Sequence, residues 1–216
     1  MKRLQFFLVF ILICSISFVL YRYTINIEQK KSKTSIINTP TTIPPVIQDA
    51  KRIIKNTNVD NASIDQLRTK AYAYYLTEDY VNAAKIYEQL IEKLPQDSTL
   101  YQLLGDTYGK QKDYKKTQMM YEKSININPL RNPAISALAD LFYDKLLKPN
   151  DAINVYIVAL NSDPTNTQYM LLLANLYKIQ GNYEDALSWY EKVLLQEPSN
   201  NTAKIQKEIT KEFIRR

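Results

Sequence analysis

The hydrophobic and polar positions along the chain divide it into three parts. Residues 4–21 form an uncharged and largely apolar run, and residues 24–63 are mostly polar. From residue 64 onward, apolar side chains recur at the three- and four-residue spacings of amphipathic helices. The pattern therefore predicts an all-α fold preceded by a separate N-terminal segment.

The N-terminal run has the length of a membrane-spanning helix. Two basic residues, Lys2 and Arg3, precede 18 uncharged residues from Leu4 to Tyr21. An α-helix of that length spans about 27 Å, close to the hydrocarbon thickness of a bilayer. We therefore expect a transmembrane anchor over residues 1–23. The short basic start favours export of the remainder to the periplasmic side of an inner (cytoplasmic) membrane.

Two other N-terminal signals are alternatives. A cleaved signal peptide needs small residues before the cut, and Ser15-Ile16-Ser17 fits, but apolar residues continue beyond it. A lipoprotein signal would place a small residue before Cys14, where the chain has Ile13. An uncleaved anchor fits the whole stretch best.

The polar segment after the anchor is predicted to be an extended tether. Residues 24–63 include the stretch TPTTIPP at 39–45, and prolines disfavour regular structure. Residues 45–57 can form one short amphipathic helix, because apolar residues such as Val46 and Ala50 share a helical face. A disordered linker over the same residues is the alternative.

One phrase recurs through residues 64–200. A proline closes each copy, and the spacings between these prolines are 34, 35 and 34 residues: Pro95, Pro129, Pro164 and Pro198. Each copy also has a small residue followed by an aromatic residue, once in its first half and once in its second half. A fixed period of this size indicates stacked supersecondary units.

The phrase resembles the tetratricopeptide repeat, a helix–turn–helix unit. The small and aromatic positions of the first helix are filled by Ala71 with Tyr74, Gly105 with Tyr108, Ala139 with Phe142, and Ala174 with Tyr177. Those of the second helix are filled by Ala83 with Tyr87, Thr117 with Tyr121, Ala152 with Tyr156, and Ala186 with Tyr190. The resemblance implies an α-solenoid of four helical hairpins, at residues 64–97, 98–131, 132–166 and 167–200.

Individual copies depart from the common pattern. Lys70 stands at a usually apolar position of the first copy, where either a missing neighbour or the preceding short helix explains it. The 35-residue spacing is expected to come from a longer turn in the third copy, LLKPND at residues 146–151. Gly181 supplies the corresponding turn of the last copy.

The C-terminal residues 201–216 are predicted to form a capping helix. Ile205, Ile209 and Phe213 recur every four residues and form an apolar stripe opposed by basic residues. We expect this stripe to cover the exposed edge of the last hairpin. A helix that binds a membrane or a partner is the alternative.

Charge and composition argue against nucleic-acid binding and catalysis. The net charge of +6 comes from the flanks, because residues 64–200 carry 14 Lys and Arg against 17 Asp and Glu, and a nucleic-acid interface needs a basic folded surface. The chain has no histidine, one cysteine and three glycines, which leaves no usual triad, zinc site or phosphate-binding loop. We expect a non-enzymatic protein with no cofactor, metal or small-molecule substrate.

The resemblance also implies a concave inner face lined by the first helix of each copy, where partners of this family bind as peptides or helices. By position, this face carries Arg68, Tyr72, Tyr75, Gln102, Asp106, Lys110, Ser136, Asp140, Tyr143, Leu171, Asn175 and Lys178. Asp106 and Asp140 stand where a carboxylate-gripping subfamily has asparagine or a cation. We predict that these two acids lack a compensating cation and attract a Lys or Arg of the partner. Partner binding at another surface is the alternative.

These features together favour a membrane-anchored adaptor or assembly factor that binds a protein or peptide segment on the extracytoplasmic side. The layout resembles bacterial envelope assembly factors, such as those of cytochrome c maturation or those that accompany the translocon. The alternative is a structural subunit of a membrane-embedded complex of the secretion or division type.

Overall fold

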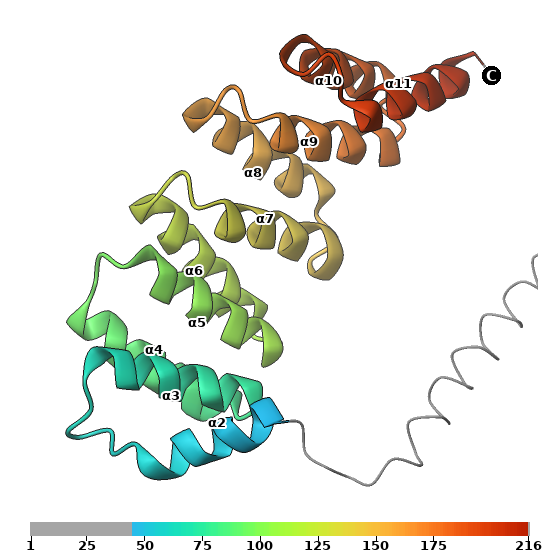
Figure 1. Ribbon diagram of the computed structural model, residues 1–216. Helices are drawn as coiled ribbons and strands as arrows, with labels where there is room; N and C mark the ends of the chain where they lie inside the picture. The colour runs from blue at the N-terminus through green and yellow to red at the C-terminus, as the bar shows by residue number, and fades with distance from the viewer. Residues whose placement is uncertain (1–44, 216) are drawn as a thin grey trace, which may run out of the picture. The chain divides into compact units, whose positions relative to one another are not determined.

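The computed structural model describes residues 45–215 (Figure 1), so the predicted anchor at 1–23 and the predicted tether up to residue 44 lie outside the described residues. The described part contains ten α-helices, one π-helical turn and no strand. These elements are α2 (Pro45–Asn56), α3 (Ile64–Leu76), α4 (Tyr80–Lys93), α5 (Ser98–Lys110), α6 (Tyr114–Ile127), α7 (Asn132–Asp140), η1 (Leu141–Lys145), α8 (Pro149–Ser162), α9 (Thr167–Ile179), α10 (Tyr183–Gln196) and α11 (Asn201–Ile214). Within residues 45–215, no helix is long and apolar enough to cross a membrane.

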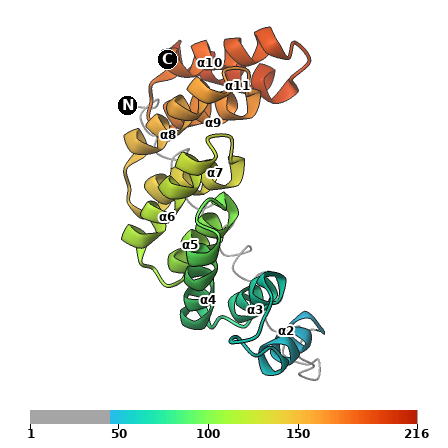
Figure 2. The ribbon, with the colours of Figure 1, turned by 90° about the vertical axis from the view of Figure 1, so that its left-hand side faces the viewer.

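The helices from α3 onward stack in chain order. α3 packs against α4, α5 against α6, α7 against α8 and α9 against α10, and each pair forms a hairpin. The second helix of each hairpin also contacts the first helix that follows it. Figures 1 and 2 show these pairs following one another, with α11 after the last pair. The prediction of an all-α solenoid is confirmed.

A small residue of the first helix allows the two helices of a hairpin to approach closely. In the second hairpin, a Cβ added to Gly105 would lie 2.7 Å from the ring carbons of Tyr121. The other first helices carry buried alanines at this position, and each clusters with the buried tyrosine of its second helix: Ala71 with Tyr87, Ala139 with Tyr156, and Ala174 with Tyr190. Close packing of this kind needs one small side chain at the contact.

Each hairpin turn has three residues, and the middle residue adopts a left-handed backbone. The φ values are 62° at Glu78, 63° at Lys112, 53° at Leu147 and 80° at Gly181. Only glycine adopts this conformation without a steric cost. Helix packing therefore imposes the turn geometry on Glu78, Lys112 and Leu147 against their own preference.

The extra residue of the third hairpin lies in a helix, and the prediction of a longer turn was wrong. The turn at 146–148 has three residues like the other turns. The first helix instead ends in the π-helical turn η1, where the amide of Leu146 donates to the carbonyl of Leu141 at 3.0 Å. A π-turn accommodates one additional residue inside a helix without breaking its backbone hydrogen bonding.

The segment before the first hairpin covers Lys70. The Lys70 side chain is buried, and its ammonium donates a hydrogen bond to the carbonyl of Thr57, which follows α2. The ammonium also lies 5.8 Å from the centre of the Tyr74 ring. Of the two explanations for this lysine, cover by the preceding segment accounts for it, because a buried ammonium needs a partner.

α11 packs against α10 through a face other than the predicted one. Ala203 and Thr210 are fully buried, whereas Ile205, Ile209 and Phe213 are 58%, 43% and 46% exposed. The prediction that the apolar stripe covers the last hairpin is therefore wrong for Ile205 and Ile209, whereas the Phe213 ring stacks on Tyr183 of α10 with the ring centroids 5.2 Å apart. Small side chains at the contact allow the two helix backbones to approach, and the larger Ile205 and Ile209 remain outside it.

Relief of the turn strain should stabilise the solenoid. Leu147 is 79% exposed, so Leu147→Gly removes little packing. The left-handed conformation costs a non-glycine residue about 1–2 kcal/mol, partly offset by roughly 0.5–1 kcal/mol of backbone entropy that glycine loses on folding. We expect the melting temperature, measured by circular dichroism, to rise by about 1–4 °C.

The reverse change provides the control. Gly181 occupies the equivalent turn position, and a Cβ there would meet no atom within 4 Å. Gly181→Ala should therefore lower the melting temperature by a similar amount through backbone strain alone. A lower melting temperature for Leu147→Gly would contradict the proposed strain.

Candidate functional site

Side chains from successive first helices meet in a hollow of about 300 Å³, here called the inner hollow. Four of the predicted inner-face residues line it together: Tyr75, Asp106, Lys110 and Asp140. Five further charged or polar residues line the hollow and were not predicted from the sequence: Tyr114, Thr117, Tyr121, Asp144 and Lys145. Spacing within the first helices could have indicated Asp144, which lies one helical turn after Asp140.

Asp106 is held in place by a tyrosine of the second helix. The hydroxyl of Tyr121 donates a hydrogen bond to Oδ1 of Asp106 at 2.7 Å. Burial raises the pKa of the Asp106 carboxyl, although hydrogen bonds from Tyr121 and Gln102 and the charges of Lys110 and Arg131 act in the opposite direction. The prediction that Asp106 lacks a compensating cation was therefore wrong, because two cations act on it.

Asp140 is the second acid of the inner hollow, and it is exposed. Partial desolvation and the neighbouring Asp144 carboxylate raise its pKa. Three carboxylates line the hollow, those of Asp106, Asp140 and Asp144. Two ammonium groups, those of Lys110 and Lys145, also line it. The excess of one negative charge favours a cationic side chain of a ligand.

The hydrogen bond from the second-helix tyrosine to a first-helix side chain, seen at Asp106, recurs in the last hairpin but not in the third. The hydroxyl of Tyr190 donates to Oδ1 of Asn175 at 2.6 Å. In the third hairpin, burial and the charge of Asp140 raise the pKa of the corresponding Tyr156, and the Ser136 side chain acts in the opposite direction. Since η1 places one more residue between Asp140 and Tyr156, Asp140 does not receive the equivalent bond and its carboxylate is available to a ligand.

Several other predicted inner-face residues connect consecutive hairpins. Arg68 pairs with Asp97 at 2.5 Å. Gln102 accepts a hydrogen bond from Nε of Arg131 at 3.0 Å, and Lys178 donates to a side chain of α11. These contacts give the three residues a structural role, and their part in binding stays a prediction.

Aromatic side chains extend the site toward the first hairpin. The rings of Tyr72 and Tyr75 are stacked with centroids 6.3 Å apart, and Tyr75 meets the edge of Tyr80 at 5.5 Å. Tyr72 is 52% exposed. Burial and the charge of Asp106 raise the pKa of Tyr75. Tyr143 and Leu171, the remaining predicted residues, are half-buried.

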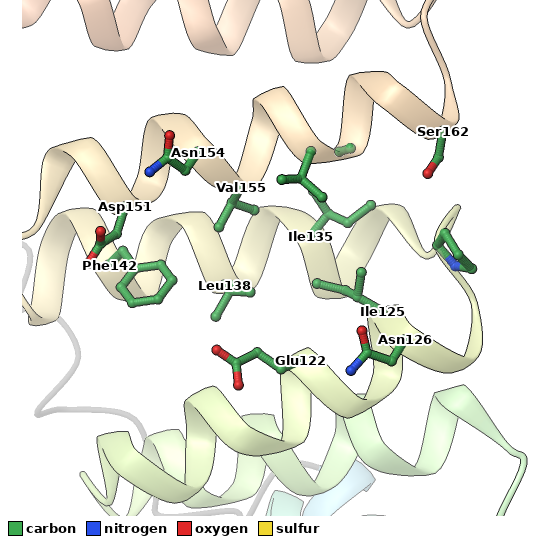
Figure 3. A pocket seen from close by; sticks show the side chains of 13 residues that line it. Glu122, Ile125, Asn126, Ile135, Leu138, Phe142, Asp151, Asn154, Val155 and Ser162 are labelled. Carbon is green, nitrogen blue, oxygen red and sulfur yellow. The ribbon is translucent and has the colours of Figure 1, made fainter.

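A second hollow of about 620 Å³, here called the outer hollow, lies between the second helices α6 and α8 (Figure 3). Ile135, Leu138 and Val155 occupy its middle, and Glu122 and Asp151 also line it. It contains none of the residues predicted for the inner face. The outer hollow is therefore a separate surface that was not predicted from the sequence.

One residue of the outer hollow carried a signal in the sequence. Val158 is 59% exposed, and it stands two residues after Tyr156, the tyrosine that recurs in the second helix of each repeat. The same position is polar in the other three copies: Gln89, Lys123 and Lys192. An exposed apolar residue at a position that is polar in the other repeats indicates that the surface is locally more apolar there.

The fold and the inner hollow define a helical-hairpin repeat protein with a surface built across several repeats. Models of the tetratricopeptide repeat match residues 98–129 and 168–200. These matches fall on the hairpins α5–α6 and α9–α10. The chain therefore contains tetratricopeptide repeats.

Known proteins share parts of this chain. Lipopolysaccharide assembly protein B of Haemophilus influenzae is 36% identical over 105 residues, which cover 47% of this chain and 26% of that protein. Formate-dependent nitrite reductase complex subunit NrfG of Escherichia coli O157:H7 is 27% identical over 118 residues, 53% of this chain and 60% of that protein. The chain thus spans less than two thirds of either relative.

A solved structure supports the fold. YrrB, described as a TPR protein with an unusual peptide-binding site, matches with a TM-score of 0.51 and 19% sequence identity. The match covers 76% of this chain and 82% of YrrB. At 19% identity, the similarity supports the solenoid architecture but does not identify residues of the binding site.

Ionisation of Asp106 should destabilise the folded protein. Its pKa is raised above the unfolded value, so the stability that this group contributes is complete below the unfolded pKa, about 4, and is lost as pH rises through the folded pKa. Asp106→Asn should therefore gain stability relative to the wild type as the pH rises from about 3 to 7. Urea unfolding at several pH values measures this difference.

Tyr121→Phe tests how the hydrogen bond from Tyr121 affects the pKa of Asp106. The variant removes a hydrogen bond that favours the charged carboxylate, so the pKa of Asp106 should rise further. The loss of stability with rising pH should then be larger than in the wild type. Equal pH dependence in the wild type and Asp106→Asn would show that Asp106 has no raised pKa.

Proposed function

We propose that the protein is a non-enzymatic tetratricopeptide adaptor or assembly factor that binds a protein or peptide segment on its inner face. The observation that carries the proposal is the inner hollow, where Tyr75, Asp106 and Asp140 come from three successive first helices. An extended segment lying across these helices contacts several repeats at once. Similarity to a lipopolysaccharide assembly protein and to a subunit of a reductase complex supports a role in an assembly process or within a complex.

The proposal includes four copies of the repeat. Two hairpins are matched by the repeat models, and the other two, α3–α4 and α7–α8, share their construction. Both have a buried small residue beside a buried tyrosine, and both have a left-handed middle residue in the turn, Glu78 and Leu147. The same physical contacts therefore support the same repeat in all four hairpins.

The proposal also places the repeats outside the cytoplasm, held at an inner membrane by residues 1–23. Its support is the uncharged run from Leu4 to Tyr21 behind two basic residues. A run of this length and composition favours a membrane-spanning helix. The anchor would keep the captured segment close to the bilayer.

Deletion of residues 1–23 should release the protein from the membrane. The full-length protein should sediment with membranes, and the truncated protein should remain in the soluble fraction with unchanged helix content. Cell fractionation with N-terminal sequencing measures both. A full-length product found in the soluble fraction with its N-terminus near Phe18 would show cleavage and would refute the anchor.

A structural subunit of a membrane-embedded complex is the second candidate, supported by the similarity to a reductase complex subunit. The two candidates differ in their behaviour without a partner. An adaptor lacking residues 1–23 purifies as a soluble monomer, whereas a structural subunit requires its partner for solubility.

Neutralising both inner-face acids should weaken partner binding. Each charge-assisted contact to a Lys or Arg contributes about 1.5–3 kcal/mol, so Asp106→Asn with Asp140→Asn should raise the Kd at least tenfold. The partner is first identified by cross-linking and mass spectrometry with the full-length protein, and its affinity is then measured by calorimetry. Helicity and folding at neutral pH should be preserved.

The matched control removes two acids from second helices, Glu92→Gln in α4 and Asp185→Asn in α10. Both residues are exposed and lie outside the inner hollow. This control should leave the affinity unchanged. Equal affinity of the Asp106/Asp140 variant and the wild type would exclude the inner hollow as the recognition surface.

A further inference from the structure

The buried residues of α11 show that it takes the place of a further first helix. Ala203 follows Pro198 by five residues and is fully buried, as is Leu100, which follows Pro95 by five residues. Thr210 and Thr107 also occupy equivalent positions, twelve residues after Pro198 and Pro95 respectively. Both threonines are fully buried, and each donates its hydroxyl to the carbonyl four residues earlier at 2.7 Å.

This register assigns the apolar stripe of α11 to the inner face. Ile209 follows its proline by eleven residues, as Asp106, Asp140 and Asn175 follow theirs. Ile205 corresponds to Gln102, Ser136 and Leu171, and Phe213 corresponds to Lys110 and Ile179. The stripe therefore continues the row of side chains that forms the inner hollow.

The inner face consequently changes character along the solenoid. Its middle part, on α5 and α7, is polar and acidic. Toward the C-terminus, apolar side chains join Asn175 and Lys178 of α9 and form an apolar part: Leu171, Ile179, Ile205, Ile209 and Phe213. Ile179 is 62% exposed, and the stripe on α11 is about half exposed. Apart from Phe213, which stacks on Tyr183 of α10, packing does not require apolar side chains here, because polar residues occupy the same positions in earlier repeats.

The edge of α11 that a following helix would cover has a different composition. Earlier first helices bury a leucine nine residues after the closing proline, as at Leu104 and Leu138. α11 has Lys207 at this position, bound to Glu191 of α10 at 2.9 Å. A second copy stacked end to end on α11 would bury this lysine, so the apolar stripe is not a stacking edge.

We infer that the inner face is bipartite and takes one extended peptide segment that carries a Lys or Arg and, at a fixed distance, large apolar side chains. The basic side chain binds the acids of the inner hollow, and the apolar side chains cover Ile205, Ile209 and Phe213. This inference rests on the proposed function and adds the chemistry of the segment. Two observations support the inference. The acidic and the apolar parts lie along one row of positions, and they are complementary to a basic and an apolar side chain of the segment.

The geometry of packed helices sets the spacing within the segment. Neighbouring packed helices are about 8–10 Å apart. Four such contacts connect α7 to α11 through alternating second and first helices. The separation of α7 and α11 therefore lies between two and four helix spacings, on the order of 20–30 Å. An extended chain covers about 3.3–3.6 Å per residue. The basic and apolar side chains of the segment should therefore be about six to nine residues apart.

Defined synthetic peptides test the inference on the full-length protein. Each fluorescein-labelled peptide carries an Arg–Arg pair and a Leu–Phe pair in a Gly/Ser background, at separations from about three to twelve residues and in both orders. We expect fluorescence anisotropy to show the tightest binding at a separation of about six to nine residues. At that separation, Ile205→Ser with Ile209→Ser should raise the Kd at least tenfold.

The matched control is Val158→Ser with Leu195→Ser, which removes two exposed apolar residues from the second helices α8 and α10. It should leave the Kd unchanged. Circular dichroism should show the same helix content in all variants, because the four substituted side chains are exposed.

The other outcomes separate the inference from the proposed function. If Asp106→Asn with Asp140→Asn weakens binding but the Ile205/Ile209 variant does not, the bipartite face is refuted and the proposed function stands. If only the Val158/Leu195 variant weakens binding, the ligand lies on the second helices and both are refuted. Equal affinities at every separation would refute the fixed spacing and with it the inference.

Discussion

The contact between a small residue of a first helix and a tyrosine of its second helix sets the geometry on which the solenoid and its inner face depend. At Gly105, the ring of Tyr121 lies where a Cβ would be, so α5 and α6 approach more closely than side chains of ordinary size allow. From this position the tyrosine hydroxyl reaches Asp106, the next residue of α5. One contact therefore closes the hairpin and orients an acid of the inner hollow.

Variation of the same contact makes the repeats chemically different from one another. Tyr190 holds Asn175 in the last hairpin as Tyr121 holds Asp106 in the second. In the third hairpin the π-turn η1 changes the separation by one residue, and Asp140 is left exposed beside Asp144. A single additional residue, accommodated inside a helix, thus changes one position of the inner face from a structural partner into an available carboxylate.

The charges of the inner hollow are balanced closely enough for it to fold without a ligand. Lys110 and Arg131 offset part of the cost of the buried Asp106 carboxylate, because opposite charges favour the ionised form. On α11 the same row of positions is apolar, and its residues Ile205, Ile209 and Phe213 remain about half exposed. An inner face with both kinds of surface suits a segment that presents a cation and an apolar side chain together, which gives a physical basis for selectivity among segments.

The repeated phrase and its closing prolines were sufficient to predict the hairpins and the all-α solenoid, and repeat position was sufficient to bring Tyr75, Asp106, Lys110 and Asp140 into one hollow. Periodicity carries this information because it determines which residues share a helical face. The position of the extra residue and the packed face of α11 depended on tertiary structure. A helix or a turn can accommodate an insertion, and only the hydrogen bonding of the whole hairpin selects between them. Likewise, the apolar stripe with Ile209 was the strongest signal in α11, but close approach of the helix backbones selected the smaller Ala203 and Thr210 for burial.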